Sequence, residues 1–157
     1  MKNQALFSKH KDYRYMLSRV WDEQRPTLGI VGLSPSYGDA SVTDKETQKQ
    51  VAIADALGYG SIYVLNLFAF IESEEQTLFD SEDPIGPNND RYIERYLARC
   101  DKVLCVWGND GQHLNRSQAI QKLYKNLYYL KLNKTGEPAQ LSGIKRSNRL
   151  IKFDTPH

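Results

Sequence analysis

Polar and aromatic residues follow the apolar runs of this sequence, and their side chains suit the recognition of a small polar ligand. Ser34, Pro35, Ser36 and Tyr37 come directly after the apolar run 28–33. In such a turn, main-chain N–H groups and hydroxyls can bind an anion or the polar edge of a ligand. An ordinary proline turn that binds nothing is an equally good interpretation of these residues.

Asn66 ends a second apolar run, and two phenylalanines, Phe68 and Phe70, follow it closely. A buried amide offers two donors and an acceptor, which suits the edge of a nucleobase, and an aromatic ring supplies a stacking surface. An amide that only ties two loops together is the alternative. We expect ligand recognition, because Asn66 stands at the end of a predicted strand.

A third apolar run ends in Trp107, Gly108 and Asn109. The glycine lets the main chain come close to a ligand, whereas the alternative is a tight turn beside a core tryptophan. Three polar residues further along the chain complete the set of ligand-binding candidates: Lys134, Gln140 and Arg146.

Asp39 is the candidate catalytic residue, since a carboxylate in the first turn could activate a water molecule as a general base. Its alternative role is to bond the main chain of its own loop, as aspartates in turns commonly do. His113 could donate a proton, although a solvated histidine at a helix start is the more common situation. The sequence contains no nucleophile elbow, Walker loop, dinucleotide fingerprint or zinc-ligand spacing, so we expect no cofactor and no metal.

Continuous apolar runs predict strands that are buried on both faces of a parallel sheet, and they cover residues 28–33, 61–67 and 102–107. A fourth strand is expected at 128–132 and a short last one at 150–153. The alternating pattern of 13–21 predicts a half-buried strand at a sheet edge. Ligands of open α/β sheets lie outside the carboxyl ends of the strands, so we expect four loops to gather there.

Helices are expected between these strands. Thr43 and Glu46 form a capping box, which predicts a helix that begins there and ends near Gly58. Asn88 or Asn89 is expected to cap a second helix. A third helix is predicted from apolar residues at helical spacing, namely Ile120, Leu123, Tyr124 and Leu127.

The composition is that of a single globular domain spanning residues 1–157, with 40% hydrophobic and 25% charged residues. A net charge of +2 is too small to indicate nucleic acid by itself. Basic residues do gather near the C-terminus, at Lys145, Arg146, Arg149 and Lys152. A solvated surface is a more common origin for such a segment than a phosphate-binding patch.

Two cysteines, Cys100 and Cys105, are too few for a disulfide framework or a metal site. No apolar run approaches the roughly 20 residues that span a membrane, and the N-terminus lacks the apolar stretch of a signal peptide. We therefore expect a cytoplasmic protein that does not bind membranes.

Several ordered motifs resemble domain-of-unknown-function family 1643, a bacterial and phage family, over residues 13–141. The motifs are Leu17-x-Arg19-x-Trp21, Leu33-x-Pro35-Ser36 with Asp39-Ala40, Asn66-Leu67-Phe68-Ala69-Phe70, residues 83–90 (DPIGPNND) and Trp107-Gly108-Asn109. This resemblance implies no particular activity.

The layout is more distantly similar to that of the uracil-DNA glycosylase superfamily, with counterparts at 32–35, Asn66, 107–108 and 138–141. In that superfamily the asparagine reads the base, and an Asp or Asn in the first turn handles the water. Ser34 stands where family 1643 usually has Asn, and Gln140 lies near where both groups have His. Recognition at Asn66 could persist while hydrolysis is weak or absent, which favours binding.

We therefore expect one α/β domain with three layers, α/β/α, around a mostly parallel sheet of four or five strands, in a layout like that of uracil-DNA glycosylases. The expected function is recognition of a nucleobase or nucleotide at the carboxyl edge, with N-glycosidic hydrolysis as the reaction if chemistry occurs. Nucleic acid is a further partner to consider. One alternative is a binder that sequesters a nucleotide-like small molecule, and the other is a protein-interaction module that uses the acidic 72–83 loop.

Overall fold

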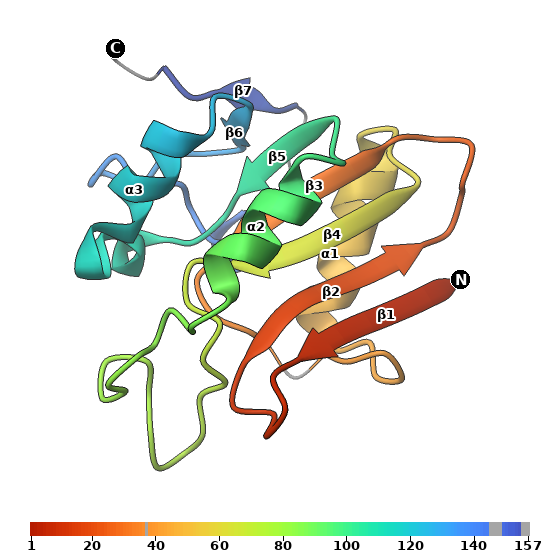
Figure 1. Cartoon of the computed structure of the whole chain (residues 1–157). Helices are drawn as coiled ribbons and strands as arrows, with labels where there is room; N and C mark the ends of the chain where they lie inside the picture. The colour runs from red at the N-terminus through yellow and green to blue at the C-terminus, as the bar shows by residue number, and fades with distance from the viewer. Residues whose placement is uncertain (37, 145–148, 155–157) are drawn as a thin grey trace.

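The computed structural model describes residues 1–36, 38–144 and 149–154, and one seven-stranded sheet runs through it (Figure 1). The strands lie in the order β1-β2-β4-β3-β5-β6-β7. They are β1 (Lys2–Phe7), β2 (Arg14–Val20), β3 (Thr27–Gly32), β4 (Ser61–Asn66), β5 (Lys102–Cys105), β6 (Leu127–Tyr129) and β7 (Ile151–Lys152). The described residues also form the helices α1 (Lys45–Ala56), α2 (Asn89–Leu97) and α3 (Arg116–Leu123), and the 3-10 helices η1 (Asn109–Asn115) and η2 (Leu141–Gly143).

The protein is an α/β protein, as predicted, but its sheet is mixed. Strands β4, β3, β5 and β6 are parallel to one another, whereas β1, β2 and β7 pair antiparallel. The prediction of a mostly parallel sheet with four or five strands was therefore wrong in strand number and in the share of parallel pairs. Strand β1 accounts for much of the difference, because its residues are exposed or half-buried and its apolar residues are limited to the last three.

Strand β1 pairs along β2, so β2 is an inner strand rather than the expected edge strand. Six of the seven residues of β2 are buried, including two arginines: Arg14 is 2% exposed and Arg19 is fully buried. The alternation of polar and apolar residues suggested that the polar side of this strand faces water. It faces other parts of the protein instead.

A bulge interrupts the pairing of β1 with β2. Leu6 pairs with Met16 and Phe7 pairs with Arg14, so Tyr15 has no partner of its own in β1. Tyr15 then stacks on Tyr92 of α2, with ring centroids 4.7 Å apart. The bulge places Tyr15 and Met16 on the side of the sheet that faces α2. The Arg14 side chain extends to the other side, toward the loop that precedes α1.

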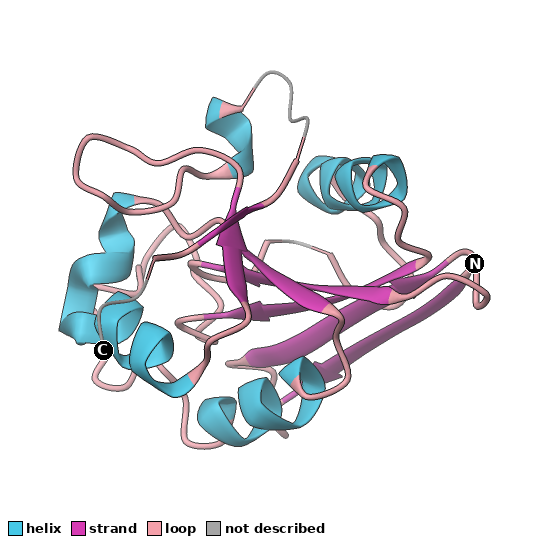
Figure 2. Ribbon diagram, turned by 90° about the horizontal axis from the view of Figure 1, so that it is seen from above, coloured by secondary structure: helices cyan, strands magenta, loops and turns pink. Residues whose placement is uncertain are grey.

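Helices cover both faces of the sheet, α1 on one face and α2 with α3 on the other (Figure 2). The cap of α1 is Asp44 and not Thr43, since the Asp44 carboxylate accepts a 2.9 Å hydrogen bond from the main-chain N–H of Thr47. Gly58 follows the end of α1 with φ +96°, as the capping pattern predicted. Asn88 precedes α2, but its side chain makes no capping hydrogen bond.

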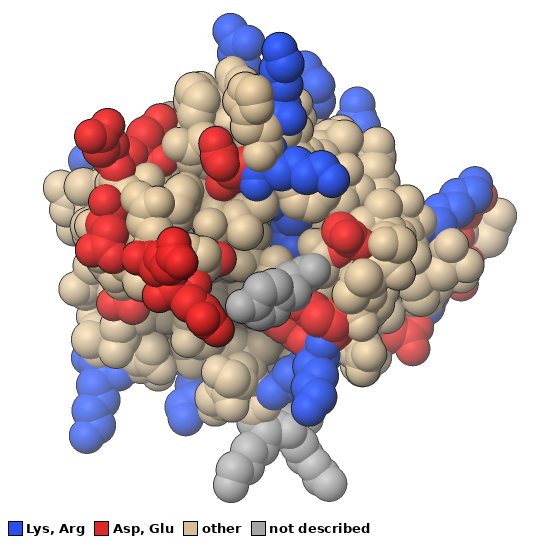
Figure 3. All heavy atoms as spheres, turned by 90° about the horizontal axis from the view of Figure 1, so that it is seen from below, with Lys and Arg blue, Asp and Glu red and all other residues tan. Residues whose placement is uncertain are grey.

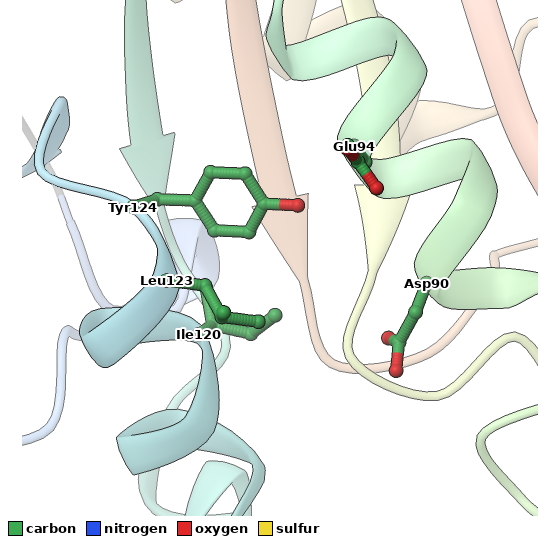
Figure 4. Close-up of a pocket in the computed structure, with 5 residues that line it drawn as sticks. All are labelled: Asp90, Glu94, Ile120, Leu123 and Tyr124. Atoms are coloured by element: carbon green, nitrogen blue, oxygen red, sulfur yellow. The ribbon is translucent and has the colours of Figure 1, made fainter.

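The third predicted helix is shorter than its apolar spacing suggested. Helix α3 ends at Leu123, and Leu127 already belongs to β6. Leu123 is 70% exposed instead of buried. It borders a pocket of about 240 Å³ between α2 and α3, together with Asp90, Glu94, Ile120 and Tyr124 (Figure 4).

Two hydrophobic clusters form the core, one on each face of the sheet. Side chains of Val31, Leu65, Cys105 and Trp107 pack on the face of α2 and α3. Their sequence neighbours, among them Ile30, Val64, Leu104 and Val106, pack on the face of α1. No helix of the described residues combines the length and apolar character needed to cross a bilayer.

Trp107 is a fully buried part of this core. Its indole N–H donates a 3.0 Å hydrogen bond to Glu137 Oε1, and the chain at Gly111 lies directly against its ring. A Cβ added at Gly111 would lie only 2.1 Å from Trp107 Cδ1. No side chain larger than a hydrogen atom fits there without displacing the ring.

Gly111→Ala is therefore expected to lower the free energy of unfolding by about 1–3 kcal/mol through overpacking against Trp107. Gly143→Ala is the matched control, because a Cβ added at Gly143 meets nothing within 4 Å. Urea unfolding of both variants measures the difference. Equal stability of the two variants would show that the Trp107 ring moves freely.

Candidate functional site

The loops after β3 and β4 lie side by side at the carboxyl edge of the sheet. Gly32 and Asn66 are in register at the ends of these strands. The pairing continues into the loops, since the Phe68 N–H donates to the Leu33 carbonyl at 2.9 Å. A side-chain bond adds to this contact, from the Ser34 hydroxyl to Glu72 Oε1 at 3.2 Å. Two of the predicted loops are therefore brought together.

Asn66 is 3% exposed, and its side-chain amide is incompletely satisfied. Its main-chain carbonyl accepts a 2.9 Å hydrogen bond from Asn89 Nδ2. Its own Nδ2 has no hydrogen-bond partner among the described residues. Its Oδ1 lies over Gly32, where an added Cβ would approach it to 2.9 Å. A buried donor without a partner is uncommon and calls for a physical explanation.

The predicted stacking residues lie deeper than expected. Phe68 is fully buried, and its ring contacts His113 with centroids 5.4 Å apart. Phe70 is half-buried and meets Tyr13 edge to face, with ring centroids 6.2 Å apart. Trp107 is buried in the core on the opposite face from Asn66. Of these rings only Phe70 is partly accessible to a ligand.

The turn that contains Ser34, Pro35 and Ser36 rests on Arg14. Arg14 Nη1 donates to the carbonyls of Ser36 and Gly38 at 3.2 and 2.8 Å. Burial lowers the pKa of Arg14 to about 10, although nearby Asp44 opposes this shift. Tyr37, the fourth predicted residue of this turn, lies outside the described residues.

Arg19 holds the next part of the same loop. Its guanidinium donates to the main-chain carbonyls of Asp39 and Val42 and to the Thr43 hydroxyl. Neither Arg14 nor Arg19 was among the predicted site residues. In the sequence, an arginine within an alternating strand resembles any solvent-facing residue, so these contacts could not be inferred from the pattern.

The Asp39 carboxylate is hydrogen-bonded within its own loop. Oδ1 accepts hydrogen bonds from the main-chain N–H groups of Ser41 and Val42, at 2.8 and 2.6 Å, and from the Ser41 hydroxyl at 3.0 Å. These bonds, chiefly the one from Val42, lower the pKa of Asp39. A carboxylate with a lowered pKa is a weaker base. This geometry therefore favours hydrogen bonding within the loop over the activation of water as the role of Asp39.

A second group of predicted residues forms around Gly108, which has φ +75°. A Cβ added there would lie 2.8 Å from Gln140 Cγ, so the two residues are in close contact. Asn109 Oδ1 accepts hydrogen bonds from Asn133 Nδ2 and the Thr135 hydroxyl, at 2.9 and 2.7 Å. Lys134 is exposed beside them. Arg146 lies outside the described residues.

Strand alternation places Asn66 and Gly32 on the same face of the sheet as α1, because Val64 and Ile30 pack under that helix. Gly108 lies beyond β5, and its contact with Gln140, which lines a pocket beside α1, places it on the same face. Two of these three positions are glycines. The main chain at the ends of β3 and β5 therefore carries no side chain between Asn66 and Gln140.

A pocket of about 420 Å³ adjoins this region on the α1 face. It lies between the first turns of α1 and the segment that leads into η2. Its lining includes the cationic residues Lys45 and Lys49, together with Gln140. Lys49 Nζ also donates to the carbonyl of Leu141 at 2.6 Å, which ties α1 to this segment.

Acidic side chains gather beside the connection between β4 and α2, as Figure 3 shows in a view from below Figure 1. Glu74 and Glu75 are exposed. Glu72 instead turns inward, because its Oε2 accepts a 2.9 Å bond from the Leu78 N–H while Oε1 contacts Ser34. Among the described residues, no three His, Cys, Asp or Glu side chains cluster to hold a metal ion.

Residues 14–139 match the family described as "Protein of unknown function (DUF1643)". Because this match covers more than half of the 157 residues, the chain belongs to that family. The resemblance seen in the sequence motifs over 13–141 is thereby confirmed. No curated protein and no solved structure matches the chain.

Arg14→Met is expected to lower the free energy of unfolding by about 2 kcal/mol or more, because two carbonyls of the 34–38 turn lose their charged donor. Arg25→Met is the matched control, since Arg25 makes exposed ion pairs with Asp22 and Asp55, and such pairs contribute little. Urea unfolding gives both values, and limited proteolysis reports cleavage within 33–44. If both variants match the parent protein, Arg14 does not hold the turn.

Proposed function

We propose that this protein recognises a nucleobase or nucleotide at the carboxyl edge of its sheet, with Asn66 contacting the base edge. The observation that carries the proposal is the buried Nδ2 of Asn66, which has no hydrogen-bond partner among the described residues. Leaving such a donor unpaired costs about 1–3 kcal/mol. A ligand carbonyl or ring nitrogen would satisfy it.

The glycines beside Asn66 support the proposal, because a flat ligand needs room above the main chain. Gly32 is in register with Asn66, and Gly108 contacts Gln140 on the same face. A base between Asn66 and Gln140 would meet amide groups at two positions, and each amide can donate and accept. The exposed Gln140 side chain would adjust to the ligand, whereas Asn66 is fixed.

The pocket beside α1 supplies a place for phosphate. Lys45 and Lys49 line it together with Gln140, so a nucleotide with its base near Asn66 would extend toward two cations. Glu46 lines the same pocket and limits its net positive charge. A pocket with two lysines and one glutamate favours a mononucleotide. A long polyanion would need many of its phosphates to be neutralised.

Recognition without turnover is the function that the described groups support best. In the uracil-DNA-glycosylase-like layout that we propose for the site, the first turn would have to activate water. Asp39 is engaged by its own loop and has a lowered pKa. The Ser34 hydroxyl donates to Glu72 Oε1 at 3.2 Å, and Glu72 Oε2 is engaged by the Leu78 N–H, so both groups already tie loops together.

Asn66→Leu tests this proposal, because leucine keeps the approximate shape of asparagine and removes the unpaired donor. We expect binding of nucleosides or nucleotides to weaken at least about tenfold, a loss of about 1.4 kcal/mol. The free energy of unfolding should stay unchanged or rise, since the buried unsatisfied group is gone. Isothermal titration with a panel of nucleosides and nucleoside monophosphates measures binding, and urea unfolding measures stability.

Asn126→Leu is the control, because Asn126 precedes β6 at the opposite edge of the sheet and donates to the Asp101 carbonyl. Native mass spectrometry of the protein purified from cells identifies any ligand that it retains. Undiminished binding by Asn66→Leu would contradict the proposal. A large loss of stability in that variant would show that Asn66 only ties loops together.

A further inference from the structure

A pocket of about 580 Å³ lies between the η1–α3 segment and the loop before Pro138. Four amide side chains line it, from Gln112, Asn115, Gln118 and Gln121, and one carboxylate, from Glu137. No lysine, arginine or apolar side chain of the described residues contributes to its lining. The pocket is therefore rich in hydrogen-bond acceptors and carries one negative charge.

Glu137 is only 7% exposed, although it is charged. Its Oε1 accepts hydrogen bonds from Trp107 Nε1 at 3.0 Å and from the Ser117 hydroxyl at 2.6 Å. Gln121 Nε2 in turn donates to the Ser117 hydroxyl at 2.9 Å. The two groups that donate to the carboxylate, Trp107 and Ser117, are both neutral, and both donate to the same oxygen.

The second carboxylate oxygen, Oε2, has no donor among the residues that the structure describes. Within the described residues, no group donates to Glu137 Oε2, and no lysine, arginine or histidine forms an ion pair with Glu137. Burying a carboxylate without a cation is costly, because neutral donors compensate only part of its lost hydration. Glu137 lines the pocket, so a cation bound there could offset this cost.

We propose that this pocket binds a small organic cation of the guanidinium type, with Glu137 as its counter-ion. A guanidinium carries several N–H donors in one plane, so it can pair with Glu137 Oε2 and reach the amide oxygens of Gln112 or Gln118 at the same time. A phosphate or carboxylate ligand would meet the negative charge of Glu137 and is excluded.

This site lies on the other face of the sheet from the proposed nucleobase site. Glu137 reaches the pocket beside Trp107, whose side chain packs on the face of α2 and α3. Asn66 lies on the face of α1, since its neighbour Val64 packs there. Either site can therefore fail its test without affecting the other.

The test uses two-dimensional ¹H–¹⁵N NMR of the full chain titrated with ethylguanidinium. The Trp107 indole N–H reports directly on Glu137, because it donates to that carboxylate. The indole of Trp21 donates to the exposed carboxylate of Asp55 and serves as an internal control. We expect a saturable shift of the Trp107 signal and no saturable shift of the Trp21 signal.

N-ethylurea, a neutral molecule of nearly the same shape, should bind at least about tenfold more weakly than ethylguanidinium. Glu137→Gln should weaken ethylguanidinium binding by a similar factor. The glutamine oxygen can still accept from Trp107 and Ser117, so the fold should persist. Glu94→Gln, which changes an exposed carboxylate on α2, should leave binding unchanged.

Three results would overturn the proposal. They are equal binding of N-ethylurea and ethylguanidinium, undiminished binding by a folded Glu137→Gln variant, and the absence of a saturable Trp107 shift. If Glu137→Gln fails to fold, the comparison of the two probes in the parent protein still decides the question. Any of these negative results would show that Glu137 serves only to tie its loop to Trp107.

Discussion

The main-chain pairing of β3 with β4 continues past the ends of both strands, and the geometry of the carboxyl edge depends on it. The Leu67 N–H donates to the Gly32 carbonyl at 2.9 Å, and the next residue pairs with Leu33 in the same way. On the other side of this segment, Asn89 Nδ2 and Arg116 Nε donate to the carbonyls of Asn66 and Leu67, at 2.9 and 3.0 Å. The main chain at Asn66 is therefore held on both sides, and the buried side chain starts from a fixed position. Such preorganisation reduces the entropy that binding would otherwise cost.

Two buried arginines extend this rigidity to the loop between β3 and α1. Arg14 and Arg19 donate to four main-chain carbonyls of that loop, those of Ser36, Gly38, Asp39 and Val42. Burying a guanidinium is costly, and burial lowers the pKa of Arg14 to about 10. The bonds from Nη1 offset part of this cost, although Arg14 Nε has no partner among the described residues. Because both residues lie on an inner strand, the loop is anchored to the sheet itself and not only to α1.

The sequence predicted well those features that come from continuous apolar runs. Strands β3, β4 and β5 and the glycine after α1 follow from such runs and from local capping rules. The sequence did not predict β1 or the inner position of β2. Pairing with β1 makes β2 an inner strand, but it leaves the polar and apolar pattern of β2 unchanged. For the same reason Arg14 and Arg19 were missed.

The residues of the predicted site also fall into two groups, those that topology places and those whose burial or contacts the sequence does not reveal. Placement of Ser34, Asn66, Gly108 and Gln140 near strand ends follows from topology, since carboxyl ends of parallel strands meet at one edge. Burial of Phe68 and Trp107 could not be foreseen, because a buried and a stacking aromatic ring have the same sequence signature. The sequence left two roles open for Asp39, a general base or a side chain that bonds its own loop. The positions of the Ser41 and Val42 N–H groups, which only the structure shows, favour the second role.

The dipeptide Trp107–Gly108 shows how one strand end can serve both faces of the sheet. Trp107 directs its indole to the face of α2 and α3, where it holds Glu137, while Gly108 lies against Gln140 on the face of α1. Glu137 and Gln140 belong to one short segment, which the Gly108 N–H fixes by donating to the Pro138 carbonyl at 2.9 Å. Together with the bonds from Asn133 N–H to the Glu137 carbonyl and from Ala139 N–H to the Lys131 carbonyl, both at 2.8 Å, this bond holds the segment that carries both side chains. The two candidate sites share this framework but lie on different faces of the sheet, so the ligands that we propose for them can differ in charge.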